Sequence, residues 1–257
     1  MPASPIVSVD WLADHLDDAD VLIVDVRPAG AYQQAHLPGA ISLDLAPARL
    51  ASSSAQAVEE WVPRLEALVR SAGIRPGQTV VFYEDISGTM AAYGVWLLDA
   101  AGLGNGAMLD GGIQAWYRAG KPLTDEPVTP QPSETAITPN LDVVGTLDGL
   151  VTEIESGMGQ RVDSRGDGEY AAGAMPAATH VDWMRHLDPA TGTFLPLDDL
   201  RQFYAALDPS VPTTTYCAGG FRAANSYVVL KALGFGQPRN YAPSWSEWGA
   251  NPRTPKE

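Results

Sequence analysis

The sequence predicts an α/β protein of two tandem domains, each a mostly parallel sheet flanked by helices. Two observations support this prediction: similar blocks of residues occur twice in the chain, and apolar strand-like runs alternate with amphipathic helix-like runs within each copy. This alternation is typical of parallel sheets that are covered on both faces. With 257 residues, of which 45% are apolar, the chain is long enough to form two hydrophobic cores.

The internal repeat consists of two blocks. In the first block, residues 25–45 match residues 163–183 without gaps. In the second, five residues of the first half match five of the second: Gly88, Ala91, Ala92, Gly102 and Trp116 against Gly220, Ala223, Ala224, Gly234 and Trp248. We therefore expect two homologous domains, over residues 1–122 and 140–257. The proline-rich segment 123–139 is expected to be an extended linker along the surface.

The expected elements of the first half follow in order. An apolar run predicts a strand over residues 21–26, and a short helix-like stretch precedes a further short strand that begins near Ile41. The amphipathic run 58–71 predicts a helix. The apolar run 78–83 then predicts a central strand, and residues 90–101 predict another helix.

The second half repeats this layout around a single cysteine. Strands are expected over residues 161–164 and 211–216, and the run 223–233 predicts a helix that ends at Gly234. Cys217 therefore lies at the carboxyl end of a strand, in a glycine-rich turn before a helix. Open α/β sheets bind ligands at this position. The repeat places Asp85 at the corresponding position of the first half.

The chemistry of the turn favours a reactive thiol at Cys217. A lone cysteine forms no intramolecular disulfide and is a poor zinc site, so it is either a buried packing residue or a reactive group. Gly219 and Gly220 allow successive N–H groups from Ala218 to Ala223 to form an anion-binding nest. The helix dipole and the cation of Arg222 add positive potential, so we expect activation by this loop rather than by a histidine.

Composition and charge exclude several classes of partner. The chain has 31 acidic and 16 basic residues and a formal charge of −15, which argues against nucleic acid or an anionic membrane as a partner. No basic segment followed by an apolar stretch marks a secretory signal, and no apolar run is long enough to span a bilayer. We expect a cytoplasmic protein with a reduced thiol.

Several other polar and aromatic residues are predicted to have structural roles. Asp163 and Arg165 recur in the first half as Asp25 and Arg27, which indicates an ion pair that stabilises a strand end. Trp248 recurs as Trp116 and is expected in the core. Trp245 does not recur and is a candidate for the wall of the binding site. The remaining candidates are expected at the surface or as satisfied polar groups: His180, His186 and Lys231.

Four motifs together resemble the tandem-domain rhodanese family, which comprises thiosulfate and 3-mercaptopyruvate sulfurtransferases. The motifs are Tyr32-x-x-x-His36-Leu37-Pro38-Gly39-Ala40, the Asp-x-Arg sequences at 25–27 and 163–165, the loop 217–222 and the closing segment 244–248. The resemblance implies two rhodanese-like domains, of which the first is catalytically inactive, and a reaction that uses no metal and no organic cofactor. It implies that Cys217 is catalytic, carries a persulfide, and is surrounded by substrate-binding residues: Ala218, Gly219, Gly220, Phe221, Arg222, Ala223 and Trp245.

The loop sequence bears on the sulfur donor. Arg222 is its only cation, as in several bacterial thiosulfate enzymes of the family, and Glu169 occupies a position where animal relatives have a substrate-binding arginine. We therefore expect thiosulfate as the donor, with 3-mercaptopyruvate as the alternative. The expected acceptor is cyanide or a thiol such as reduced thioredoxin.

Two functions of other classes are weighed against sulfur transfer. A phosphatase loop of the related type needs an arginine at position 223, whereas the arginine stands at 222, so the loop is one residue too short to wrap a phosphoryl group. A non-catalytic sulfur-carrier or binding module is expected to lack Cys217 or the loop glycines. Both are present, although this alternative stays open.

Overall fold

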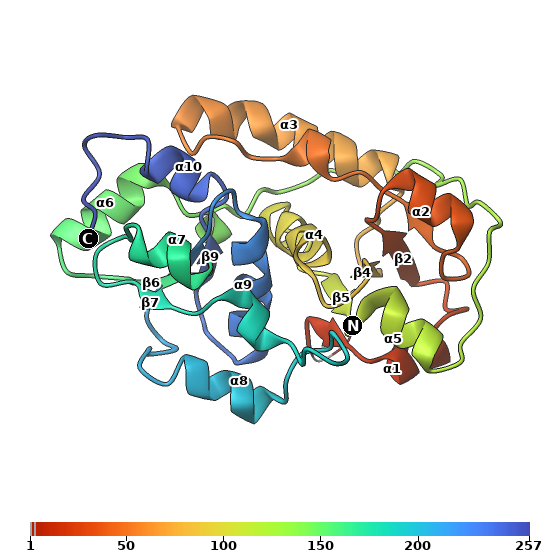
Figure 1. Cartoon of the computed structure of the whole chain (residues 1–257). Coiled ribbons are helices and arrows are strands. Elements are labelled where there is room, and N and C mark those ends of the chain that lie inside the picture. Colours follow the sequence, from red (N-terminus) through yellow and green to blue (C-terminus); the bar gives the residue numbers. More distant parts are fainter. Residues whose placement is uncertain (1, 3) are drawn as a thin grey trace.

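Two parallel β-sheets organise the chain in the computed structural model, which describes residue 2 and residues 4–257 (Figure 1). The first sheet has the strand order β1-β5-β4-β2-β3 and the second the order β7-β6-β8-β9, with every strand pair parallel. The strands are β1 (Ile6–Val7), β2 (Val21–Asp25), β3 (Ile41–Ser42), β4 (Thr79–Tyr83), β5 (Gly106–Leu109), β6 (Gln160–Asp163), β7 (Thr179–His180), β8 (Thr213–Tyr216) and β9 (Pro238–Asn240). The predicted fold class, two α/β domains with parallel sheets, is confirmed.

Helices cover both sheets and connect their strands. The first half contains α1 (Val9–Asp14), α2 (Ala29–Gln34), the 3₁₀ turn η1 (Ala46–Ala48), α3 (Ala55–Ser71), α4 (Thr89–Ala100) and α5 (Gly112–Arg118). The second half contains η2 (Leu141–Val143), α6 (Leu147–Glu155), α7 (Asp167–Ala171), η3 (Trp183–His186), α8 (Leu197–Phe203), α9 (Phe221–Ala232) and α10 (Ser244–Trp248). The helix α3 begins before the predicted residue 58 because the Ser54 side chain accepts a hydrogen bond from the N–H of Ala57.

Helices α4 and α9 lie at the centre of the molecule, between the two sheets (Figure 1). Each has twelve residues and is almost entirely buried. Tyr227 and Lys231 of α9 both bind Asp99 of α4, and the amide of Asn225 donates to the carbonyl oxygen of Ser87, just before α4, at 2.9 Å. The two halves are therefore joined through the helices that follow their central strands.

The segment that connects the halves runs extended against the first half. Thr124 forms a bridge with His36, the N–H of Val128 donates to the Tyr32 hydroxyl, and the Thr135 hydroxyl donates to the carbonyl oxygen of Ile74. The first two of these contacts satisfy backbone groups of a segment that forms no helix and no extended ladder, and the third ties a side chain of the segment to the first half. In the part of the chain that the structure describes, no helix is long and apolar enough to cross a lipid bilayer.

The strand register corrects one sequence-based correspondence. Asp25 pairs with Tyr83 in the first sheet and Asp163 pairs with Tyr216 in the second, so the two tyrosines are equivalent. Cys217 then corresponds to Glu84, and the pairing with Asp85 was wrong. The reason is that the first loop has one more residue between its tyrosine and its helix N-cap, Gly88, than the second has before Gly220.

Candidate active site

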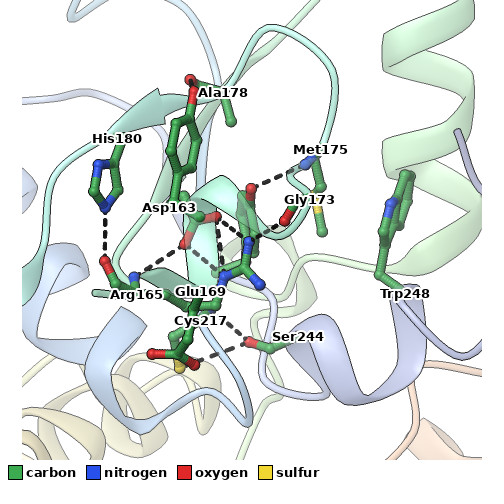
Figure 2. Close-up of polar contacts among 12 residues, drawn as sticks. Asp163, Arg165, Glu169, Gly173, Met175, Ala178, His180, Cys217, Ser244 and Trp248 are labelled. Carbon is green, nitrogen blue, oxygen red and sulfur yellow. Dashed lines mark hydrogen bonds and ion pairs between the residues drawn. The ribbon is translucent and has the colours of Figure 1, made fainter. Parts of the chain in front are cut away.

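Cys217 follows the last residue of β8 and is almost completely buried, with 1% of its surface exposed. Its backbone is held by α10: the N–H of Cys217 donates to Ser244 Oγ at 3.0 Å, and the N–H of Trp245 donates to the carbonyl oxygen of Cys217 at 3.0 Å. Ser244 Oγ also lies 4.0 Å from Cys217 Sγ (Figure 2). The N-terminus of α10 therefore fixes the position of the thiol.

The backbone around Ser244 is strained. Its φ of +55° lies in the left-handed region, which is unusual for a residue other than glycine. The Ser244 hydroxyl donates to the carbonyl oxygen of Tyr241 at 2.6 Å and accepts from the N–H of Cys217, which stabilises this conformation. Strained residues that are held in this manner occur often at functional sites.

The sulfur atom faces the N–H groups of the turn. The N–H of Gly220 donates to Cys217 Sγ at 3.1 Å. The remaining N–H groups of the turn find no acceptor within the described residues, namely those of Ala218, Gly219, Phe221, Arg222 and Ala223. They are the donors that the sequence assigned to an anion-binding nest. An anion bound beside the thiol would satisfy them.

The helix α9 begins at Phe221, two residues before the predicted start. Gly220 is its N-cap with a φ of +89°, and a Cβ atom there would lie 2.5 Å from the carbonyl oxygen of Ala242. Glycine is therefore required at this position by both conformation and space. As a result, Phe221, Arg222 and Ala223 form the first turn of α9, where unpaired N–H groups and the positive end of the helix dipole coincide.

The cation of Arg222 is matched by a carboxylate. Arg222 donates two hydrogen bonds to Glu169, at 2.6 and 2.8 Å, and Glu169 belongs to the short helix α7. These hydrogen bonds are the main reason that the pKa of Arg222 is raised and that of Glu169 is lowered, and the charge of Cys217 also raises the pKa of Arg222. Arg222 is thus electrostatically coupled to the thiol, but its ion pair with Glu169 offsets much of its positive charge.

Trp245 and the Asp163–Arg165 pair support the loop from the side of β6. Arg165 binds Asp163 at 2.6 Å, and both side chains are buried. The indole of Trp245 lies over the Arg165 guanidinium, 4.2 Å from ring centroid to Cζ. The same ion pair occurs between Asp25 and Arg27 in the first half, again at 2.6 Å. The geometry therefore agrees with a structural role for the two Asp-x-Arg motifs.

The polar residues that the sequence assigned to structural roles have partners in the fold. His180 stacks on Tyr170 and its Nε2 lies 2.7 Å from the carbonyl oxygen of Arg165. His186 is buried between Asn225 and Tyr204, and burial lowers its pKa to about 4. Lys231 forms an ion pair with Asp99. Trp248, as expected, is part of a buried cluster with Tyr216 and Tyr241.

In the equivalent loop of the first half, a glutamate side chain occupies the N-terminus of the helix. Glu84 stands where the second half has Cys217, and its Oε1 accepts hydrogen bonds from the N–H groups of Met90 and Ala91 at 2.6 and 3.1 Å. Burial raises the pKa of this carboxyl group, whereas the two backbone hydrogen bonds lower it. The N-terminus of α4 is therefore capped by a side chain of the same domain, which leaves these two donors unavailable to a ligand.

Sequence reasoning did not find Arg49 at the active site. Arg49 follows η1 in the first half, and its Nη2 lies 3.3 Å from the position that a Cβ atom of Gly219 would occupy. No local motif marks this residue, because only tertiary folding brings it to the loop. Two other arginines of the second half are engaged elsewhere: Arg239 binds Glu153 at 2.5 Å, and Arg185 packs on Phe203.

A cavity of about 830 Å³ lies away from Cys217, at the C-terminal ends of α4 and α9. Its walls include the linker residues Thr138 and Pro139 and the group of Asp99, Tyr227 and Lys231. These charges already satisfy one another across the domain boundary. Among the described residues, no cluster of three or more His, Cys, Asp or Glu side chains could hold a metal ion.

Comparison with known proteins identifies the family. The rhodanese-like domain profile matches the chain twice, over residues 8–119 and 146–251. A thiosulfate sulfurtransferase of Pseudomonas aeruginosa is 31% identical over 255 residues, with 96% of this chain and 94% of that protein covered. A probable 3-mercaptopyruvate sulfurtransferase of the same organism is 30% identical, with 99% of this chain and 98% of that protein covered.

A further relative is named a sulfur carrier, and a solved structure shares the fold. The sulfur carrier protein TtuD of Thermus thermophilus is 29% identical, with 95% of this chain and 93% of that protein covered. The crystal structure of the 3-mercaptopyruvate sulfurtransferase SseA of Escherichia coli has the same fold, with a TM-score of 0.80 and 24% identity over 95% of this chain and 100% of that chain. The chain, with its two rhodanese-like domains, therefore belongs to the rhodanese family of sulfurtransferases.

Proposed function

We propose that the protein transfers sulfane sulfur from thiosulfate through a persulfide on Cys217. The observation that carries this proposal is the buried Cys217 sulfur, which accepts a hydrogen bond from Gly220 and is surrounded by N–H groups without acceptors in the described chain. Such donors stabilise both a thiolate and the oxyanion of a bound donor. No other cysteine is present to hold sulfur between two half-reactions.

The first half-reaction follows from this geometry. The Cys217 thiolate attacks the outer sulfur of thiosulfate, a new S–S bond forms, and the S–S bond of the donor breaks. Sulfite leaves with the electron pair of that bond, so no external oxidant is needed. The N–H groups of residues 218–223 and the Arg222 side chain would bind the sulfite oxygens, and Trp245 would border the site.

The second half-reaction regenerates the enzyme. The acceptor attacks the terminal sulfur of the persulfide, and the Cys217 thiolate is the leaving group, stabilised by the hydrogen bond from Gly220. Cyanide or a thiol such as reduced thioredoxin is the proposed acceptor. The Cys217 thiol has to stay reduced between turnovers, which agrees with the proposed cytoplasmic location.

Thiosulfate is proposed over 3-mercaptopyruvate because the loop itself has one full cation, Arg222, and this cation already binds Glu169. Relatives are named for both donors, so 3-mercaptopyruvate is the second candidate. A third candidate, a sulfur carrier without multiple turnovers, is favoured by the likeness to the protein named a sulfur carrier in Thermus thermophilus. The three candidates share the Cys217 persulfide and differ in donor and turnover.

The test of this proposal is intact-protein mass spectrometry after incubation with thiosulfate. One sulfur atom on the thiol adds about 32 Da, and cyanide should remove it. Cys217→Ser should stay folded and show neither adduct nor turnover. Steady-state rates with thiosulfate and with 3-mercaptopyruvate, both with cyanide as acceptor, then assign the donor. Turnover by Cys217→Ser would overturn the proposal, and an adduct without turnover would favour the sulfur carrier.

A further inference from the structure

Arg49 of the first half lies against the catalytic loop of the second half. Its Nη2 is 3.3 Å from the point where a Cβ atom of Gly219 would stand, and its Cζ is 5.8 Å from the ring centroid of Phe221. Gly219 has no side chain to cover the guanidinium or the loop N–H groups beside it. The cation of Arg49 is consequently next to the donors of the proposed oxyanion site.

Two anchors fix the position of Arg49, and the first is the next residue in the chain, Leu50. Leu50 is fully buried, and its N–H donates to the hydroxyl of Tyr93, whose ring packs on Phe221 with a centroid distance of 4.6 Å. Arg49 is therefore attached to the first turn of α9 through an aromatic pair that spans the two halves.

A second anchor lies three residues further along the chain. The Glu247 carboxylate accepts hydrogen bonds from Ser52 Oγ at 2.8 Å, from the N–H of Ser53 at 2.9 Å and from Ser53 Oγ at 2.6 Å. Glu247 belongs to α10, the helix whose first residues hold the backbone of Cys217. The segment 49–53 thus binds the same element that positions the thiol, which fixes Arg49 relative to the site.

The charge of Arg49 is available, in contrast to the other arginines near the loop. Arg222 binds Glu169 and Arg165 binds Asp163, whereas the side chain of Arg49 forms no ion pair and no hydrogen bond within the described part of the chain. Its side chain is on the exposed side of the site. A thiosulfate dianion that approaches a protein of formal charge −15 needs a local cation of this kind.

We propose that Arg49 binds the anionic oxygens of the sulfur donor above the loop, so that the first domain supplies a cation to the active site of the second. This inference rests on the proposed function and adds a donor-binding residue to it. The guanidinium would bind a sulfonate group through two parallel hydrogen bonds. The structural alternative is that Arg49 only packs on Phe221, a contact of the cation–π type.

Steady-state kinetics of Arg49→Met with thiosulfate and cyanide tests the proposal. We expect kcat/KM for thiosulfate to fall about 10- to 100-fold, mainly through KM, as for a lost charge-assisted hydrogen bond. Arg49→Lys should recover part of the loss, because lysine keeps the positive charge but lacks the planar guanidinium that donates two parallel hydrogen bonds. Arg75→Met is the matched control, since Arg75 is exposed and precedes the amino end of β4, away from Cys217. It should change kcat/KM by less than about two-fold.

A binding measurement separates this inference from the proposed function. In the Cys217→Ser background, where no chemistry occurs, Arg49→Met should weaken thiosulfate binding in calorimetry by a similar factor. Addition of Glu169→Gln should restore part of the affinity, because Arg222 then keeps more of its charge for the ligand. A merely structural Arg49 would lower the melting temperature and leave KM unchanged.

The outcomes are distinguishable. If the wild type gains the persulfide and Arg49→Met keeps kcat/KM within about two-fold for thiosulfate and for 3-mercaptopyruvate alike, Arg49 is not a donor-binding residue and the proposed function stands. If the wild type gains no sulfur from any donor, the proposed function itself fails. A loss confined to 3-mercaptopyruvate would keep Arg49 as the oxyanion site and assign it to that donor's carboxylate.

Discussion

The loops that follow β4 and β8 show how one scaffold produces an inactive and a reactive site. Both loops join the central strand of a sheet to a twelve-residue helix, α4 or α9, with a glycine as N-cap. In the first loop, the Glu84 carboxylate caps the helix. In the second, Cys217 stands at that position and the N–H groups of the first turn keep no acceptor within the described chain. An anion site is therefore occupied by the protein in one half and open in the other.

The framework around the two loops is the same, which confines the difference to a few residues. Asp25 and Asp163 form equal ion pairs with the arginines two positions later, and each lies opposite the tyrosine that ends the neighbouring central strand. The two halves thus share the parts that hold the strand ends in place. They differ in the residue after the tyrosine and in the length of the turn, so reactivity was added or lost without a change of fold.

The largest expected effect comes from the shared ion pairs. Asp163→Asn leaves the buried Arg165 guanidinium without its counter-charge and should lower the free energy of unfolding by about 3–5 kcal/mol. Asp25→Asn should cost less, because Arg27 is half-buried and keeps Asp85 at 3.8 Å. Urea titration of both variants measures this. Only Asp163→Asn should also impair sulfur transfer by the folded protein, because Arg165 supports the catalytic loop through Trp245. Loss of activity in folded Asp25→Asn would break the proposed division of roles.

Alanine substitution tests how tightly Gly220 of the catalytic turn packs against the backbone of Ala242. Gly220 and Gly234 have similar φ values of +89° and +84°, but only at Gly220 would a Cβ atom meet backbone, 2.5 Å from the oxygen of Ala242. Gly234→Ala should cost about 1–2 kcal/mol from the left-handed conformation and keep activity. Gly220→Ala should cost about 1–3 kcal/mol more from overpacking and reduce activity at least ten-fold. Thermal unfolding and thiosulfate rates compare the pair, and equal effects would contradict this account.

The pH dependence of stability should report the buried His186. Burial lowers its pKa to about 4 in the folded protein, whereas an unfolded histidine has a pKa near 6.5. Between these values the unfolded state binds more protons, so acidification from pH 6.5 to 4 should cost up to about 3 kcal/mol of stability. Urea titrations across this range measure the slope, which His186→Gln should remove. A slope that is unchanged in the variant would assign the acid sensitivity to other groups.

The smallest expected effect concerns the cap of α4. Glu84→Ala leaves the N–H groups of Met90 and Ala91 without an acceptor and should destabilise the protein by about 1 kcal/mol, as for a lost N-cap. Glu84→Gln keeps the accepting oxygen and should cost less than half of this. Both variants should transfer sulfur at the wild-type rate, since the first loop takes no part in the chemistry. A change of rate in either would show that the two loops are coupled through the contact of Asn225 with Ser87.

Much of the fold could be predicted from local sequence. The repeat and the alternation of strands and helices indicated two parallel α/β domains, and the longer elements were found within a few residues of their observed ends. The errors have physical causes. Gly220 in the left-handed conformation starts α9 two residues early, and one extra residue in the first turn places Glu84, rather than Asp85, opposite Cys217. Turn lengths are decided by backbone geometry that residue matching does not resolve.

What the sequence by itself determined is the family framework and the single thiol, because periodicity, glycine positions and the one cysteine are properties of short segments. Only the tertiary structure decided the electrostatics of the site. Glu169 reaches Arg222 across 53 residues, and the Glu247 carboxylate binds Ser53 across 194 residues, which places Arg49 against Gly219. Such contacts arise from the packing of whole domains, and the charge that faces Cys217 depends on them rather than on the loop sequence alone.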